Sequence, residues 1–294
     1  MKRVRLTICL AMVCVMAAVN FASADTIQGI NMDFVTIGNQ GNAADTGGTP
    51  GCGAVGYNYR IGKYDVTNAQ WNTFVAAAGA PTGTDGGYGS SSYWTGAQQP
   101  TNMVSWYEAA QFCNYLTSGD KSKGAYQFSG NNANPGSFLG IDRAVAEAAF
   151  GTIYVIPTED EWYKAAYFKP DGSGYSLYAN GTDTAPIAGV NSNYNMAIGS
   201  PWNIGTGTME QNGTFDMMGN VWQWNETSFD GSYRGIRGGS YFDLDYDLSS
   251  SFRYSDLDPH YELYGVGFRV ASVPEPCSLA LLFIGGLVLR NRKR

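Results

Sequence analysis

Long stretches of Gly, Asn, Asp, Ser and Tyr separate the hydrophobic runs of this sequence, and they limit the folds that the chain can adopt. The longest are residues 38–56, 83–100 and 171–207. Loops of this length are uncommon in compact domains, and they are usually functional or braced by an ion. The hydrophobic runs between them are short and predict strands, at Phe34–Ile37, Tyr57–Val66, Thr152–Ile156 and Gly265–Ala271. The pattern predicts an α+β protein with short strands, few helices and many long loops.

Three segments begin with a helix-start signature, in which a hydroxyl residue is followed three positions later by Gln or Glu. They predict helices over about 67–78, 105–116 and 158–166. In this signature the hydroxyl accepts an amide proton from the first turn, and the Gln or Glu side chain returns to the cap residue. A fourth helix, over about 141–150, is predicted from its Ala and Glu content.

The first 24 residues have the three parts of a secretory signal peptide. A basic start (Lys2, Arg3, Arg5) precedes an apolar run over 6–19 and the small-residue site Ala22-Ser23-Ala24. We therefore expect signal peptidase to cut after Ala24, so that the protein is secreted through the inner membrane. A retained N-terminal anchor is the alternative, and the Ala-x-Ala flank argues against it.

Residues 274–294 join a Pro-Glu-Pro motif, an apolar run over 277–289 and a basic tip. The run spans roughly 20 Å as a helix, short of the ~30 Å hydrocarbon core. The three parts, in this order, resemble a PEP-CTERM sorting signal. The resemblance implies processing by an exosortase-type transpeptidase, transient membrane association through the tail, and sorting to the cell envelope or extracellular matrix of a Gram-negative bacterium. A chance apolar tail is the alternative.

The segment between these ends, residues 25–273, is acidic and poor in transition-metal ligands. Without the seven basic residues and one acidic residue of the ends, it keeps 11 basic and 24 acidic residues, a net charge of −13. This argues against a nucleic-acid partner. Its only histidine is His260, and oxygen ligands suit Ca²⁺ better than Zn²⁺ or Cu²⁺. Cys52 and Cys113 could pair in an oxidising compartment, and the sequence leaves this disulfide open.

Six short motifs follow one another through this segment. They are RIGKYDVTN at 60–68, PTNMVSW at 100–106, IPTEDEW at 156–162, FDMMGNVWQW at 215–224, RGGS at 237–240 and GFRV at 267–270. Their order and spacing over 32–272 resemble the formylglycine-generating enzyme, or sulfatase-modifying factor, family. The resemblance implies one domain, 25–273, with that family's variant of the C-type-lectin-like fold. We expect its tryptophans to be core residues (Trp71, Trp106, Trp162, Trp222 and Trp224), and Gly238 and Gly239 to be free to take positive φ.

The resemblance places a pocket near Arg237, Ser240 and Asp243, but it does not carry over the family's metal chemistry. Copper-dependent members bind the metal through two cysteines that follow the RGGS motif, the first three residues past its Ser. Here that position is Asp243, and no Cys follows as far as Phe252. A hard carboxylate cannot replace a soft thiolate on Cu(I), so we expect no copper and no formylglycine-generating oxidase activity. Iron-dependent relatives, as in ergothioneine biosynthesis, need several His ligands, which His260 alone cannot supply.

The resemblance also implies structural calcium, which would brace the long loops. Residue by residue, one ligand set is the Asp216 side chain, the Gly219 and Val221 carbonyls and the side chain at Gln223. Most members have Glu at the last position, so Gln keeps an oxygen and loses a charge. A second set includes Asn193 and the Tyr194 carbonyl, and its other ligands fall where this chain diverges.

Asp243, Asp245 and Asp247 alternate, so on an extended segment they would face one side. Such carboxylates could hold a hard cation or act as acid and base. The alternative is a solvated acidic loop, with Arg237 and Arg253 as neutralising partners.

Three functions are compatible with these features. We favour a non-catalytic, cell-surface binding module for a glycan or peptide in the extracellular matrix, because Tyr, Asn and Ser recognise polar ligands at low entropic cost. An enzyme with different chemistry near Arg237, Ser240 and Asp243 is the second possibility. A structural biofilm component is the third.

Overall fold

The computed structural model describes residues 23–82 and 93–273. Most of the predicted signal peptide and the whole predicted sorting tail lie outside these residues. The four predicted helices are present as α1 (Asn68–Ala78), α2 (Trp106–Ser118), α3 (Arg143–Phe150) and α4 (Glu159–Tyr167). Among the described residues, no helix has the length and apolar character needed to cross a membrane.

The helix starts follow the local rules read from the sequence. In α1, α2 and α4 the cap hydroxyl accepts the amide proton of the third helical residue, and that residue's side chain accepts the cap amide proton. In α2, for example, the Glu108 carboxylate accepts the Ser105 amide proton at 2.8 Å. Helix α2 ends at Gly119, whose φ of 79° is in the left-handed region that glycine adopts without strain.

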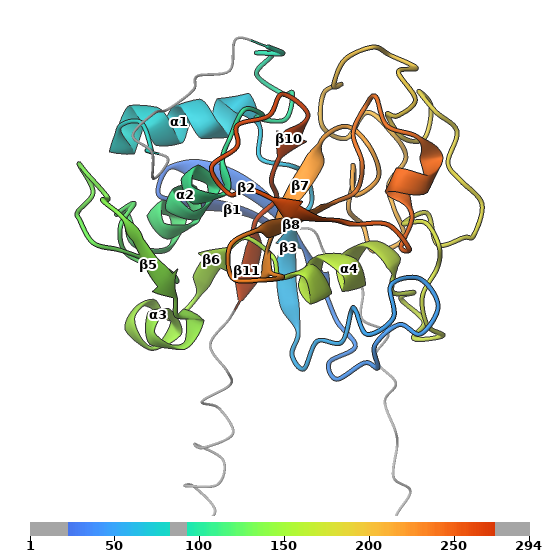
Figure 1. Cartoon of the computed structure of the whole chain (residues 1–294), viewed down its shortest axis with the longest axis horizontal. Helices are drawn as coiled ribbons and strands as arrows, with labels where there is room; N and C mark the ends of the chain where they lie inside the picture. The colour runs from blue at the N-terminus through green and yellow to red at the C-terminus, as the bar shows by residue number, and fades with distance from the viewer. Residues whose placement is uncertain (1–22, 83–92, 274–294) are drawn as a thin grey trace, which may run out of the picture.

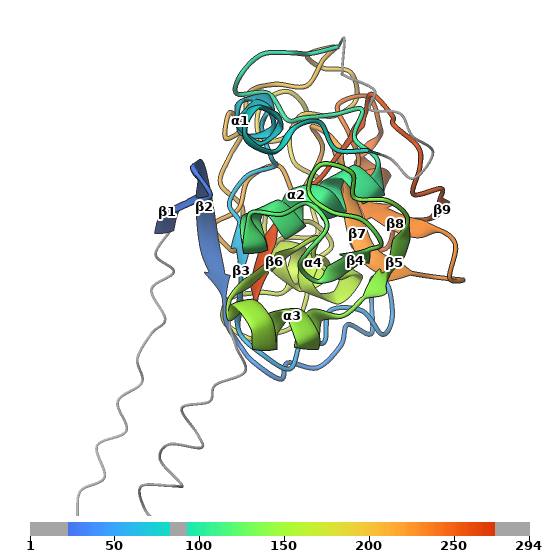
Figure 2. The same ribbon diagram turned by 90° about the vertical axis from the view of Figure 1, so that its left-hand side faces the viewer.

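The strands form two main sheets (Figures 1 and 2). The five-stranded sheet is antiparallel, in the order β1 (Ser23–Ile27), β2 (Ile30–Ile37), β3 (Tyr59–Gly62), β11 (Ala271–Val273) and β6 (Ile153–Val155). The four-stranded sheet has the order β10 (Val266–Gly267), β7 (Trp222–Ser228), β8 (Arg234–Arg237) and β9 (Tyr254–Leu257), with β10 parallel to β7. A hairpin pairs β4 (Tyr126–Phe128) with β5 (Phe138–Ile141).

The single strand predicted over Gly265–Ala271 is wrong, because the chain changes sheets within it. It leaves the four-stranded sheet after Gly267 and enters the five-stranded sheet at Ala271. A Cβ on Gly267 would lie 2.5 Å from the Thr101 carbonyl oxygen, so the crossing needs glycine there. Arg269 fills the gap between the sheets, and its guanidinium donates to the Gly62 and Phe215 carbonyls, each at 2.6 Å.

The hydrophobic core lies on both faces of the five-stranded sheet. Ile30, Met32 and Phe34 of β2 pack with residues of α1 and α2, whereas Val35 and Ile37 pack with α4. This alternation is what a strand buried on both faces requires. Cys113 lies in the first of these clusters and Cys52 in the second, and both thiols are free. The disulfide that the sequence left open is therefore not formed.

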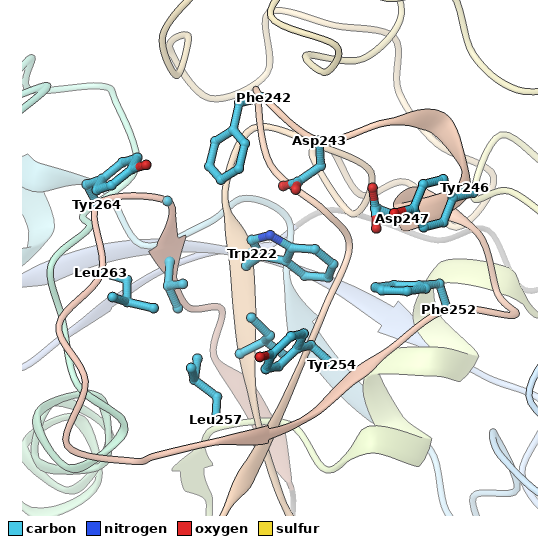
Figure 3. Close-up of a pocket in the computed structure, with 13 residues that line it drawn as sticks. Trp222, Phe242, Asp243, Tyr246, Asp247, Phe252, Tyr254, Leu257, Leu263 and Tyr264 are labelled. Carbon is cyan, nitrogen blue, oxygen red and sulfur yellow. The ribbon is translucent and has the colours of Figure 1, made fainter.

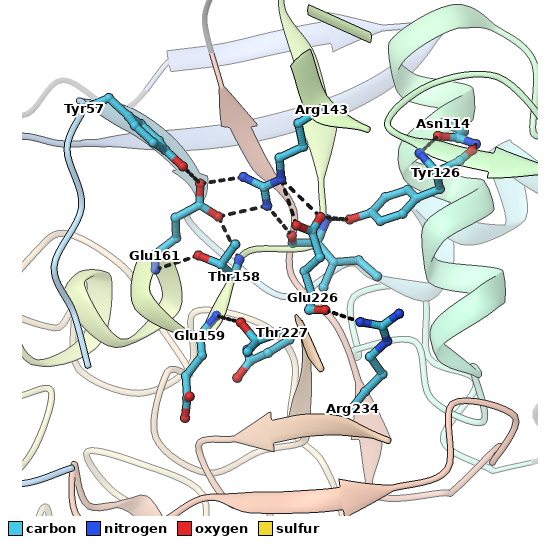
Figure 4. Close-up of polar contacts among 12 residues, drawn as sticks. Tyr57, Asn114, Tyr126, Arg143, Thr158, Glu159, Glu161, Glu226, Thr227 and Arg234 are labelled. Carbon is cyan, nitrogen blue, oxygen red and sulfur yellow. Dashed lines mark hydrogen bonds and ion pairs between the residues drawn. The ribbon is translucent and has the colours of Figure 1, made fainter. Parts of the chain in front are cut away.

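A buried ionic network joins the helices to the four-stranded sheet (Figure 4). Arg143 of α3 pairs with Glu161 of α4 at 2.8 Å and with Glu226 of β7 at 2.9 Å. The hydroxyls of Tyr57 and Tyr126 donate to these two carboxylates, at 2.6 and 2.7 Å. The two glutamates are thus fully engaged in holding α3, α4 and β7 together.

Candidate functional site

A pocket of about 460 Å³ lies over the four-stranded sheet (Figure 3). Trp222, Ile236 and Val266 line it from three neighbouring strands, and Trp222 lies in register with Val266. Tyr254 and Leu257 of β9 line a second side, and the segments 242–252 and 263–265 supply the rest. Because the lining side chains are spaced by sheet pairing, this part of the site is pre-formed.

Aromatic residues form nearly half of the lining, and we call the site the aromatic pocket. Six aromatic side chains line it: Trp222, Phe242, Tyr246, Phe252, Tyr254 and Tyr264. Phe252 contacts the Trp222 ring, with centroids 6.0 Å apart, and the Tyr246 ring edge-on at 5.3 Å. Tyr246, Tyr254 and Tyr264 are 54%, 46% and 47% exposed, so the rim offers aromatic surface to solvent. Exposed apolar surface gathered around a concavity marks a binding site more often than a bare surface does.

Two carboxylates, Asp243 and Asp247, lie on one side of the aromatic pocket (Figure 3). An oxygen of Asp243 accepts the Ser240 amide proton at 2.9 Å, and an oxygen of Asp247 accepts the Leu244 amide proton at 3.0 Å. Burial raises the pKa of both carboxyls, and the charge of Asp243 adds to the rise at Asp247. Neither forms an ion pair with a basic residue in the part of the chain that the structure describes.

The expectation that three alternating aspartates share one face of an extended segment is wrong. Residues Asp245–Leu248 form the 3-10 helix η1, which the Asp247 side chain closes by accepting the Leu244 amide proton. This turn brings Asp243 and Asp247 to the pocket and leaves Asp245 exposed outside its lining.

The expected neutralising partners are also engaged elsewhere. Arg237 is fully buried and pairs with Glu159 at 2.6 Å, and Arg253 pairs with the same carboxylate at 3.0 Å. Two guanidiniums therefore hold Glu159 at the start of α4, and the pocket carboxylates keep their negative charge unmatched.

Of the three positions that the family resemblance pointed to, only Asp243 lines the pocket. Ser240 is fully buried, and its hydroxyl donates to Asp243. Gly238 and Gly239 take φ of 101° and 70°, as expected, and a Cβ on either would come within 2.9 Å of another atom. The RGGS segment thus positions the pocket wall, and its Arg and Ser serve as scaffold.

The cysteines and the histidine lie away from the pocket lining. The Cys52 sulfur is 3.9 Å from the Arg237 guanidinium, and burial raises the pKa of this thiol to about 11. The His260 ring lies 2.8 Å from the Asp258 carboxylate and 4.9 Å, centroid to centroid, from the Tyr107 ring. Nothing in these surroundings gathers several His or thiolate ligands around one point.

The first calcium set does not fit a cation. The Asp216 carboxylate accepts protons from the Trp202 indole at 2.7 Å and from the Gly205 amide at 3.2 Å. The Gln223 side-chain oxygen accepts from the Trp162 indole at 2.7 Å and from the Arg269 guanidinium at 3.0 Å. The two side chains that would bind Ca²⁺ are therefore already engaged as hydrogen-bond acceptors, and Arg269 places positive charge beside Gln223.

The second predicted set of calcium ligands retains one side-chain oxygen without a hydrogen-bond donor among the described residues. Asn193 is fully buried, and its amide nitrogen donates to the Ser200 carbonyl at 2.9 Å. Its side-chain oxygen has no hydrogen-bond partner among the described residues. A buried oxygen without a donor is costly, and a bound cation would relieve that cost. The same described residues hold no cluster of three or more acidic, His or Cys side chains, so any cation here would meet mainly neutral oxygens.

Sequence reasoning found Asp243 and Asp247 but missed most of the aromatic lining. Tyr254 and Leu257 come from a strand that was not predicted, Tyr246 comes from η1, and Phe252 and Tyr264 come from loops. The available signal was the density of aromatic residues over 241–264. All five tryptophans expected in the core are buried there, and one of them, Trp222, also lines the pocket.

Residues 33–273 match the family described as "Sulfatase-modifying factor enzyme 1-like domain". The chain belongs to this family. The match covers nearly all of the described residues, so the fold and the aromatic pocket both lie within the family domain.

Curated relatives include two hercynine oxygenases. The one from Mycolicibacterium thermoresistibile is 27% identical over 237 residues, 72% of this chain and 50% of the relative. The one from Mycobacterium tuberculosis is 26% identical over 234 residues, 72% of this chain and 52% of the relative. This chain therefore spans about half the length of these two relatives. A chaperone protein LppX from Paenibacillus barcinonensis is 25% identical over 186 residues, 57% of this chain and 61% of the relative.

Solved structures of similar fold cover most of the chain. Treponema denticola variable protein 1 has a TM-score of 0.59 at 20% identity, over 87% of this chain and 99% of its own. CarF has a TM-score of 0.59 at 22% identity, over 82% and 97%. PvdO from Pseudomonas aeruginosa has a TM-score of 0.58 at 15% identity, over 86% and 98%. At these identities the likeness is one of fold, and it confirms the formylglycine-generating-enzyme type of C-type-lectin-like fold.

Proposed function

We propose that this family member is an exported, non-catalytic binding module whose aromatic pocket holds a glycan or a peptide of the extracellular matrix. The observation that carries the proposal is a concavity lined by six aromatic side chains and two carboxylates. Aromatic faces pack on sugar rings or side chains at low entropic cost, and carboxylates accept protons from hydroxyl or N–H groups. A purely structural biofilm component would have no use for such a pocket.

The surroundings of the pocket support binding over catalysis. A catalytic nucleophile or base must reach the reacting atom. The Ser240 hydroxyl is buried and donates to Asp243, and the Arg237 guanidinium is held by Glu159. The oxygenase activity in the names of the curated relatives would need metal ligands that the pocket lining of this chain does not offer. Copper-dependent oxidation is excluded from the proposal for the same reason.

Removing two rim tyrosines tests the binding function. The full chain is screened on a glycan array and a peptide array, and the ligand found is titrated against Tyr254→Ala/Tyr264→Ala. Both side chains are about half exposed, so their loss should weaken binding at least tenfold, or about 1.4 kcal/mol, without unfolding the sheet. Tyr233→Ala, 40% exposed and outside the pocket lining, is the matched control and should bind normally. Blank arrays at high concentration, or equal binding by the double variant, would refute the proposal.

We also propose that signal peptidase and an exosortase-type enzyme process the two ends, and that the protein reaches the cell envelope or matrix. The support is the sequence of 1–24 and 274–294 alone. Intact-mass measurement on material from the cell surface would decide it, because an unprocessed chain would keep the mass of both ends.

For calcium we propose binding at Asn193 and the Tyr194 carbonyl, and none at Asp216. Millimolar Ca²⁺ should raise the melting temperature of the wild-type protein by about 2–4 °C relative to EDTA, because a ligand that binds only the folded state stabilises it. The rise should persist in Asp216→Asn and disappear in Asn193→Ala. A rise that disappears in Asp216→Asn and persists in Asn193→Ala would instead place calcium at the first ligand set. If Ca²⁺ does not change the melting temperature of any of these proteins, the calcium proposal is wrong.

A further inference from the structure

We infer that the aromatic pocket binds a primary ammonium group on an apolar stem, namely the side chain of a lysine in an extended peptide. This inference rests on the proposed binding function and names its ligand. It follows from three features of the pocket: unmatched negative charge, the hydrogen-bonding state of the carboxylates, and the aromatic surface around them.

The negative charge of the pocket favours a cationic ligand. Other buried carboxylates near this sheet have arginine partners: Glu159 has Arg237 and Arg253, and Glu161 and Glu226 share Arg143. Asp243 and Asp247 have no such partner among the described residues. Two like charges in a half-buried pocket repel, and a cation between them offsets both the repulsion and the lost hydration. A neutral sugar would leave this cost in place.

The remaining acceptor positions favour an ammonium over a guanidinium. In each carboxylate the Oδ2 oxygen already accepts a backbone proton, from Ser240 in one case and from Leu244 in the other. The Ser240 hydroxyl donates to the same Asp243 oxygen. A guanidinium binds best as a planar fork on both oxygens of one carboxylate, and that arrangement is obstructed here. An ammonium has three rotatable donors and can give one to each carboxylate. A quaternary ammonium could give none.

The aromatic surface suits the rest of a lysine. The Lys stem is a chain of methylene groups that packs on apolar surface while its charged end stays solvated or paired. Phe252, Leu257 and Leu263 offer that surface, and the Trp222, Tyr and Phe rings attract the cation itself. The exposed rim tyrosines can then contact residues on either side of the lysine.

The position of β9 favours a peptide over a free amine. β9 is an edge strand of the four-stranded sheet and carries Tyr254 and Leu257 of the pocket. An extended peptide can add to a sheet edge through main-chain hydrogen bonds while one side chain enters a neighbouring pocket. A small amine would use the pocket but not the edge.

Calorimetric titration of the full chain with a peptide series tests this inference. The probe is the blocked pentapeptide acetyl-Ala-Ala-Lys-Ala-Ala-amide, compared with versions that carry norleucine, acetyl-lysine or arginine at the centre, and with n-butylamine. The lysine peptide should bind at least tenfold more tightly than the norleucine and acetyl-lysine peptides, and more tightly than the arginine peptide. Tighter binding than n-butylamine would identify the peptide as the source of the ammonium, whereas equal binding would assign the site to free amines and overturn the peptide part.

Variants locate the effect. Asp243→Asn/Asp247→Asn should lose at least tenfold in affinity for the lysine peptide, whereas Asp245→Asn, on the exposed side of η1, should bind like wild type. Equal affinity for the lysine and norleucine peptides in the wild-type protein would overturn the inference whether or not the double variant folds. A neutral glycan that binds well and depends on Tyr254 and Tyr264 would overturn it while leaving the proposed function intact.

Discussion

Replacing Arg143 with methionine is expected to destabilise the fold by about 3–5 kcal/mol, because it leaves two carboxylates buried without a cation. Glu161 is fully buried and Glu226 is 7% exposed, and Arg143 pairs with both. Its guanidinium also donates to the Ile156 carbonyl at 3.1 Å. Urea unfolding at neutral pH measures the change, and the midpoint should fall without a change in the slope.

The matched control is a surface ion pair. Lys123 pairs with Asp120 at 3.1 Å but its side chain is 66% exposed, so Lys123→Met should change stability by no more than about 1 kcal/mol. A second experiment neutralises the two carboxylates that Arg143→Met leaves unpaired. Adding Glu161→Gln and Glu226→Gln to Arg143→Met should restore part of the lost stability. The explanation would be contradicted if Arg143→Met lowered the free energy of unfolding no more than Lys123→Met does. It would also be contradicted if the triple variant were no more stable than Arg143→Met.

This network also explains why the four-stranded sheet was harder to predict than the helices. A helix start depends on residues three positions apart, so Thr67, Ser105 and Thr158 could be identified locally. Strand β7 reads WQWNETS, and its first five residues are all buried. The polar ones are stabilised by distant partners: Glu226 by Arg143, and Gln223 by the Trp162 indole. The alternation of Trp222-Gln223-Trp224-Asn225 gives way to three further polar residues, so the strand does not stand out in the sequence as a hydrophobic run.

The candidate site was also predicted only in part, because local residues could be found and distant partners could not. Asp243 was found because it occupies a fixed place after the RGGS motif. The roles of Arg237 and Arg253 were wrong because their partner, Glu159, lies 78 and 94 positions away along the chain. The aromatic lining was missed because β7, β9 and the segments 242–252 and 263–265, which supply it, meet only in the folded chain. Sequence therefore predicts the position of the pocket in the family domain, and long-range pairing decides its charge and its walls.

Family membership establishes the fold, whereas the residues of the pocket determine which ligands it can bind. The fold positions a concavity over the four-stranded sheet, and similar folds can carry different chemistry on the same frame. In this chain the position three residues past Ser240 holds a carboxylate, which accepts hydrogen bonds and attracts cations. Such a carboxylate suits the cationic ligand proposed above better than a thiolate-bound metal.

Raising the pH from 5 to 8 is expected to weaken the fold, because two buried glutamates are held protonated in it. Burial raises the pKa of Glu108 to about 8, and one of its oxygens has no hydrogen-bond partner among the described residues. Burial likewise raises the pKa of Glu210 to about 8, although Arg269 and Thr214 act in the opposite direction. In the unfolded chain both would titrate near 4.5.

The sign follows from proton binding. Between about pH 4.5 and 8 the folded protein holds protons that the unfolded chain has released, so the free energy of unfolding falls as the pH rises. Each carboxyl contributes at most about 1.4 kcal/mol per pH unit in this window. Burial also raises the pKa of Asp65, which adds to the fall. Lys164, whose pKa burial lowers to about 8, acts in the opposite direction only above that pH.

Glutamine substitution isolates the two carboxyls. Gln reproduces the shape and neutrality of a protonated Glu, and it can still accept the Ser105 amide proton in place of Glu108. Urea unfolding of Glu108→Gln/Glu210→Gln at pH 5, 6, 7 and 8 should therefore start near the wild-type stability at pH 5 and decline less, by several kcal/mol at pH 8. Asp256→Asn, at an exposed position of β9, is the control and should follow the wild-type curve. Parallel curves for the wild type and the double glutamine variant would show that neither glutamate holds its proton in the folded state.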